Sequence, residues 1–115
     1  MSIKSKYIFV AAMDVDAECE DLFNEVYESE HVPYLMEVPG VHSVTRLKGE
    51  AFALSIGGEE IEKPVANPVY SAIYEIDGPE VLKSAEWAEA IERGRWSQEV
   101  RPHTHNKSHT MYKVL

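Results

Sequence analysis

In the stretch Glu30-His31-Val32-Pro33 a titratable imidazole lies two residues before a proline, which disfavours helical geometry at Val32. We therefore expect the helix that precedes it to end or kink near His31. At the C-terminal end of a helix, the negative end of the dipole favours protonated imidazole and raises its pKa. His31 is accordingly the candidate general acid/base. The alternative is that it only caps the helix by bonding to nearby carbonyl groups.

Aromatic side chains are the next candidates, because aromatic walls commonly hold small apolar ligands. Trp87 shares a predicted helical face with Ile91, so core packing is favoured for it, whereas Trp96 follows that helix. Several tyrosine hydroxyls could orient a phenol or a lactone, although tyrosines in strands also simply build sheets. The candidate ligand-binding residues are Tyr34, Trp87, Trp96, His103 and Tyr112.

Three of the five histidines lie within residues 101–109. In an extended segment the imidazoles of His103 and His105 share one side, about 6.5 Å apart, while His109 lies about 13 Å beyond His105. No nearby Cys or carboxylate in the sequence completes a ligand set, so we predict no metal site. His103 is interpreted as a polar pocket residue beside Arg101, or as part of a solvated loop.

Other catalytic and cofactor patterns are not indicated by the sequence. Gly57-Gly58 is followed by two glutamates and not by a helix, so we predict no nucleotide and assign no cofactor. Cys19 has acidic neighbours, which disfavour a reactive thiolate. No Ser-His-Asp or Cys-His arrangement can be assigned from spacing, which argues against covalent catalysis.

The composition is that of one globular unit. With 115 residues, 44% of them hydrophobic, the chain can form one domain over residues 1–115. Eleven basic and twenty acidic residues give a net charge of −9, which disfavours nucleic acid and anionic membranes as partners. The first apolar run is too short to span a membrane and lacks a signal-type cleavage region, so we expect a cytoplasmic protein.

Local patterns predict the order of helices and strands. Residues 7–13 are apolar on both parities, which favours a strand covered on both faces. Apolar spacings of three and four predict a helix over residues 17–29 and another between Pro79 and Gly94. The remaining predicted elements are a further helical turn over 34–38, a reversal at Pro39-Gly40, a strand over 41–47 with alternation resuming at Phe52, Leu54 and Ile56, a surface loop over 57–68, and strands over 69–76 and 111–115.

The predicted order is β-α-β-β-α-β, which is typical of the ferredoxin-like α+β fold. In that fold a four-stranded antiparallel sheet carries two helices on one face. Both parities of the predicted strands are apolar here, so the second face also needs cover. A two-fold homodimer that packs sheet against sheet would provide it without any additional chain.

Two segments carry a family resemblance. Residues 30–35 (EHVPYL), followed by Val38-Pro39-Gly40-Val41, resemble the "EH-x-P-x-L…PG-V" segment of dimeric α/β-barrel proteins, in which Tyr27 stands at a frequent Trp or Tyr position. Residues 70–76, 79–82 and 84–87 look like the third strand and second helix of that superfamily. The nearest branch is the EthD-like or stress-responsive group. The resemblance implies a homodimeric α/β barrel with a cleft-facing histidine.

The superfamily also contains muconolactone isomerases, cofactor-free quinol-forming monooxygenases and haem-degrading or haem-binding enzymes, so it defines the fold better than the chemistry. We expect a protein that binds a small apolar or aromatic metabolite, with His31 as general acid/base of an isomerisation or a cofactor-free oxygenation. One alternative is a non-catalytic, dimeric ligand-binding or accessory protein of the EthD-like kind. Another is haem binding with His31 or a C-terminal histidine as axial ligand.

Overall fold

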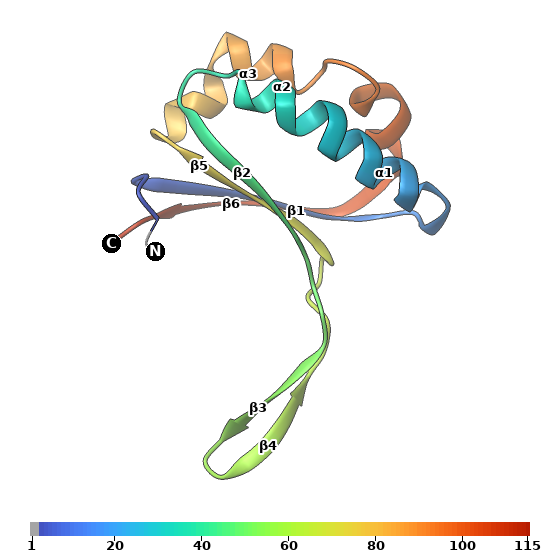
Figure 1. Cartoon of the computed structure of the whole chain (residues 1–115), viewed down its shortest axis with the longest axis vertical. Helices are drawn as coiled ribbons and strands as arrows, with labels where there is room; N and C mark the ends of the chain where they lie inside the picture. Colours follow the sequence, from blue (N-terminus) through green and yellow to red (C-terminus); the bar gives the residue numbers. More distant parts are fainter. Residues whose placement is uncertain (1–2) are drawn as a thin grey trace.

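The computed structural model describes residues 3–115, and its main body is an antiparallel sheet with helices on one face (Figure 1). The four strands lie in the order β2-β5-β1-β6, with each neighbouring pair antiparallel. This order, with the helices between the strands, confirms the predicted ferredoxin-like α+β fold. The strands are β1 (Tyr7–Val15), β2 (Val41–Lys48), β5 (Tyr70–Ile76) and β6 (Thr104–Lys113).

The first helical segment runs over residues 17–36, so of the predicted end or kink near His31 the end does not occur, and the helix is instead irregular there, with a π-helical turn over Tyr27–His31. Val32 has helical dihedral angles (φ −61°, ψ −50°) although a proline follows it. The turn just before is π-helical, and its wider winding relieves the clash between the Pro33 ring and the carbonyl four residues earlier. The successive pieces are a 3-10 turn (Ala17–Cys19), α1 (Glu20–Val26), the π-helical turn (Tyr27–His31) and α2 (Val32–Met36).

The second helical segment consists of shorter pieces than the single predicted helix. Ser84 has an extended conformation (φ −74°, ψ 154°) and interrupts it, and its Oγ then accepts a hydrogen bond from the backbone N–H of Trp87 at 3.1 Å. Gly94 has a positive φ of +70°, and the chain changes direction there. The pieces are a 3-10 turn (Pro79–Lys83), α3 (Ala85–Ala90), a π-helical turn (Trp96–Val100) and a 3-10 turn (Arg101–His103).

The core lies between these helices and one face of the sheet. Alternate residues of β1 and β5 point toward the helices, among them Phe9, Met13 and Tyr74, and they pack against Phe23 and Leu35. Phe23 and Leu35 are completely buried. No helix of residues 3–115 is long and apolar enough to cross a membrane.

The opposite face of the sheet is not covered by any of the helices that the structure describes (Figure 1). We call it the open face. The register places on it one residue parity of each strand, and β6 begins at Thr104, well before the predicted start at residue 111. The apolar and aromatic members of the open face are Ile8, Val10, Ala12, Leu47, Ile73 and Tyr112.

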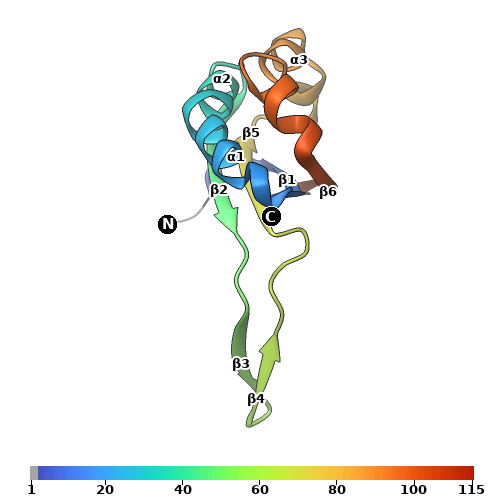
Figure 2. The same cartoon turned by 90° about the vertical axis from the view of Figure 1, so that its right-hand side faces the viewer.

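The segment between β2 and β5 forms a hairpin where the sequence predicted a surface loop over residues 57–68. β3 (Phe52–Ile56) and β4 (Glu59–Lys63) pair with each other and not with the main sheet. Gly57 and Gly58 have positive φ values of +61° and +83°, which allow a two-residue reversal that twists with the strands. We call residues 50–68 the arm, and Figures 1 and 2 show it extending away from the helices.

Candidate functional site

A cavity of about 430 Å³ lies between the helical layer and the sheet. Its size is within the range of small-molecule sites. His31, Trp87 and Trp96 line it from the helical side, and Phe9 and Tyr74 line it from the sheet. The side chains of Glu92, Arg101 and Lys107 add charge to its wall. The cavity is therefore largely aromatic, with a few polar groups that could orient a ligand.

Three of the sequence candidates come together at this cavity, although they are far apart in the chain. His31 comes from the π-helical turn of the first segment, Trp87 from α3 and Trp96 from the second π-helical turn. Trp87 contacts the core ring of Phe9 edge-to-face, with ring centroids 6.0 Å apart. The tryptophans thus pack against the core and line the cavity at the same time.

The other three sequence candidates do not line this cavity. The ring of Tyr34 lies under the guanidinium of Arg93, 4.2 Å from its Cζ. Tyr112 is 57% exposed and belongs to the open face, since it pairs with Ile8. His103 is directed toward the loop after β1, as described next.

His103 and His105 both lie against one carboxylate that the sequence did not associate with them. His103 Nδ1 and His105 Nε2 are each 3.3 Å from an oxygen of Asp16. The fold thus supplies an acidic neighbour for this pair, which sequence spacing alone did not indicate. No group of three or more His, Cys, Asp or Glu side chains in residues 3–115 has an arrangement that could hold a metal ion.

The imidazole of His31 is the least satisfied polar group of the cavity. His31 is only 5% exposed, and its Nδ1 has no hydrogen-bond partner among the residues that the structure describes. The ring stacks on Trp96, with centroids 4.2 Å apart and planes 18° apart, and it meets Tyr27 edge-to-face at 5.0 Å. An unpaired buried polar atom costs about 1–3 kcal/mol. A ligand that supplies a hydrogen-bond partner would recover part of that cost.

The pKa of His31 is lowered from 6.5 to about 4, firstly by burial and secondly by the positive charge of Arg101. The sequence-based expectation of a raised pKa is therefore wrong. It assumed that His31 lies at a helix C-terminus, whereas the helix continues to Met36. Desolvation then dominates, because it disfavours the charged imidazolium. His31 is neutral at neutral pH.

Glu30, the residue before His31, helps to position Trp96, the ring that stacks on His31. The Glu30 carboxylate accepts hydrogen bonds from the backbone N–H of Arg95 at 2.9 Å and from Arg95 Nε at 2.6 Å. These bonds, the backbone one first, lower the pKa of the Glu30 carboxyl group. They tie the chain just before Trp96 to the first helical segment. Sequence reasoning missed this role, although the position of Glu30 beside His31 was a signal.

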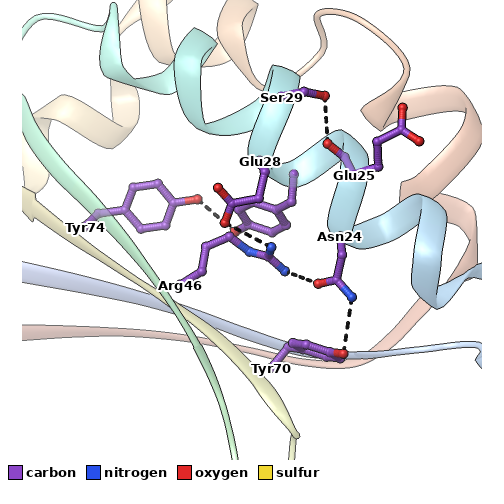
Figure 3. A network of polar contacts seen from close by, with 8 residues as sticks. Asn24, Glu25, Glu28, Ser29, Arg46, Tyr70 and Tyr74 are labelled. Atoms are coloured by element: carbon purple, nitrogen blue, oxygen red, sulfur yellow. Dashed lines mark hydrogen bonds and ion pairs between the residues drawn. The ribbon is translucent and has the colours of Figure 1, made fainter.

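Two buried tyrosines supply further polar groups at the cavity. The hydroxyl oxygens of Tyr27 and Tyr74 are 3.0 Å apart, and burial raises the pKa of both phenols. The guanidinium of Arg46 lies over the Tyr27 ring, 4.6 Å from its centre. Figure 3 shows Arg46 held by the side chains of Asn24 and Glu28, at 2.7 and 3.3 Å. Tyr74 was only one of several strand tyrosines in the sequence.

Comparison with known proteins identifies the fold. No family model and no curated protein matches the chain. A variant of MhuD with two manganese protoporphyrin IX molecules bound per active site has a TM-score of 0.60 at 14% identity, covering 95% of this chain and 94% of that one. The haem-degrader MhuD from Mycobacterium tuberculosis, with two haems in its active site, has a TM-score of 0.58 at 15% identity over 95% of both chains.

The third structure is a protein of the ethyl tert-butyl ether D (EthD) family from Bacillus halodurans. It has a TM-score of 0.58 at 13% identity, covering 95% of this chain and 99% of that one. These likenesses and the sheet order show that the chain has the EthD-like, ferredoxin-like fold of the dimeric α/β-barrel proteins. At this level of identity they establish the fold alone.

Proposed function

We propose that the protein binds a small, largely aromatic molecule in the cavity, and that His31 hydrogen-bonds to this ligand and accepts a proton from it. The observation that carries the proposal is the buried Nδ1 of His31, which has no hydrogen-bond partner within residues 3–115, in a ring that lines the cavity. Trp87 and Trp96 provide aromatic walls for the rest of the ligand. The likeness to proteins that bind porphyrins or belong to the EthD family supports a small-molecule ligand.

The low pKa of His31 defines its part in the reaction. Because the imidazole is neutral at neutral pH, it starts as a base and not as an acid. With a pKa of about 4 it is a weak base. It can therefore accept a proton from an activated carbon or a phenol only if the conjugate anion stays beside the new imidazolium and stabilises it. Isomerisation and cofactor-free oxygenation can both begin with this step.

We also propose that the protein is a homodimer that packs the two open faces together. The helices that the structure describes leave the open face uncovered. Its edge-strand residues Leu47 and Tyr112 are 46% and 57% exposed, whereas Ile8 and Ala12 on the central strand β1 are each 8% exposed within one chain. A two-fold pairing buries the same patch on both copies. Tyr112 lies on the open face and is then a candidate contact between the two copies. Tyr34 and His103 lie outside the cavity, so we do not propose them as ligand contacts.

Calorimetric titration with 1-naphthol, a phenol with two fused rings, tests the cavity proposal. We expect saturable binding to the wild type, with affinity reduced about tenfold or more in His31→Phe, because the ligand loses a hydrogen bond in a buried site. Tyr112→Phe is the matched control, since Tyr112 lies on the other face of the sheet. Equal affinity in wild type and His31→Phe, or no binding at all, would contradict the proposal.

Turnover separates an enzyme from the non-catalytic alternative. Oxygen consumption and product formation are measured with the bound phenol, in wild type and in His31→Phe. Turnover that is lost in the variant supports proton transfer by His31. Tight binding with no turnover of any phenol bound would favour the ligand-binding or accessory protein.

Haem is a second candidate ligand, favoured by one specific observation. The cavity holds two imidazoles, of His31 and of His109, and His31 is neutral, which is the form that binds metals. His109 stacks on Phe9, with ring centroids 5.8 Å apart. Either histidine would hold the iron, while Arg101 and Lys107 would lie near the haem carboxylates. Haem would supply one-electron chemistry and the chemistry of O₂ activation.

A haemin titration tests this candidate. Saturable binding with a shifted Soret band, lost in His31→Phe or in His109→Phe, would support it and identify the axial ligand. An unchanged Soret band at equimolar protein would remove it, while leaving the phenol titration as an independent test.

A further inference from the structure

We propose that the arm, residues 50–68, clasps a second copy of this chain, an inference that rests on the homodimer proposed above. The arm is amphipathic. Phe52, Leu54 and Ile56 share one side of β3, and Ile61 lies opposite Leu54 on the same side of β4. The other side of β3 carries only Ala53 and Ser55.

The apolar side of the arm remains largely exposed in the part of the chain that the structure describes. Phe52 is 57% exposed, Leu54 36% and Ile56 51%. The two strands pair only with each other, and an isolated two-stranded hairpin is at best marginally stable in water. The radius of gyration, 15.8 Å, exceeds the value of about 13 Å expected for a compact domain of this length. The arm therefore needs another surface to cover its apolar residues.

The position of the arm indicates which surface that is. It leaves the end of the sheet where β2 stops and β5 starts, on the side away from the helices, and bends back below the sheet (Figure 1). The arm thus lies on the same side of the sheet as the open face. A second copy that packs its own open face there would be partly enclosed by the arm. The two-fold symmetry would let its arm do the same in return.

The charge of the arm argues against a membrane as the occupant. The arm carries four acidic residues and one basic residue, a net charge of 1 − 4 = −3. An anionic lipid surface would repel it. A second copy is also acidic overall, with a net charge of −9, so its attraction to the arm has to be local. Lys4 and Lys6 could supply it, since the ion pairs among residues 3–115 include neither of them, nor the arm residues Glu60 and Glu62.

Sedimentation equilibrium of matched variants tests the inference. Leu54→Glu places a carboxylate on the apolar side of β3, and Ala53→Glu places the same group on its other side. We expect a dimeric wild type, a dimer dissociation constant raised about tenfold or more by Leu54→Glu, and little change with Ala53→Glu. Because Leu54→Glu could also disorder the hairpin, a variant with residues 50–68 replaced by a short Gly-Ser linker is measured as well.

The outcomes separate this inference from the proposals on which it rests. If Leu54→Glu and the armless variant dimerise as tightly as the wild type, the arm does not clasp a partner, although the sheet-to-sheet dimer stands. A wild type that stays monomeric at micromolar concentration overturns both the dimer and the arm proposals. Binding of 1-naphthol, measured on the same samples, reports the cavity proposal separately.

Discussion

Lowering the pH from 7 to 5 should destabilise the folded chain through His31. Burial and Arg101 hold the pKa of this histidine at about 4 in the folded state, against 6.5 as its ordinary value. Between these two values the unfolded chain binds more protons than the folded one. The stability that comes from keeping the imidazole neutral is therefore fully present above pH 6.5 and is lost as the pH falls toward 4.

The size of the effect follows from the two pKa values. At pH 5 the imidazole is almost fully protonated in the unfolded chain, but only about one tenth protonated in the folded chain. Between pH 7 and pH 5 the folding equilibrium thereby shifts by a factor of about 20, which corresponds to about 2 kcal/mol. Most of that change should appear between pH 6.5 and pH 5.

Urea unfolding at constant protein concentration, followed by tryptophan fluorescence, measures this effect in wild type and in His31→Phe. Phenylalanine keeps a ring against Trp96 and removes both the titrating group and the unpaired Nδ1. Subtracting the variant from the wild type cancels the other titrating groups. Between pH 7 and pH 5 we expect the free energy of unfolding of the wild type to fall by about 2 kcal/mol more than that of His31→Phe.

At pH 7 the variant should be as stable as the wild type or more stable, because replacing an unpaired buried polar group with an apolar one is nearly neutral or favourable. Parallel pH profiles for the two proteins would refute the reasoning. They would mean that His31 titrates alike in the folded and unfolded chains, so that its ring is not held in a desolvated site.

Three further perturbations test the supports of the cavity. Gly40→Ala should cost about 1–3 kcal/mol in urea unfolding, because φ is +93° there and a Cβ would meet a packed side chain at 2.6 Å; a cost near zero would contradict the assigned turn. Tyr27→Phe and Tyr74→Phe should each cost about 1 kcal/mol, whereas the double variant should cost less than the sum, since the hydroxyls pair with each other; simple additivity would argue against that pair. Glu30→Gln should weaken 1-naphthol binding and shift the emission of Trp96, with Glu18→Gln on the exposed start of the same helical segment as the control; unchanged emission would show that Glu30 does not position the ring.

The element order was predictable because the patterns that encode it are local. The apolar, aromatic-rich run over residues 69–76 and the spacings of three and four over 17–29 depend only on near neighbours in the chain. Local rules failed where one local signal was outweighed by another. Pro33 indicated a helix end, but the π-helical turn before it accommodates the proline and lets the helix continue. Gly57-Gly58 indicated a loop, but it serves as the turn of a hairpin.

The candidate site was predictable in its members and not in its geometry. His31, Trp87 and Trp96 have the residue types of a small-molecule site, and the cavity contains all three. The contact between His31 and Trp96 goes with the chain reversal at Gly94 and the hydrogen bonds from Arg95 to Glu30, a residue 65 positions earlier. Local sequence patterns do not predict a contact between residues that are 65 positions apart in the chain.

By itself, the sequence determined the ferredoxin-like order of helices and strands and the apolar character of both faces of the sheet. Both follow from the hydrophobic pattern within each segment, which depends only on near neighbours in the chain. Only the tertiary structure decided that His31 is neutral and lacks a partner for Nδ1. The physical reason is that a pKa depends on solvent access and on nearby charges. For His31 both are set by Trp96 and Arg101, which folding brings to it from the other end of the chain.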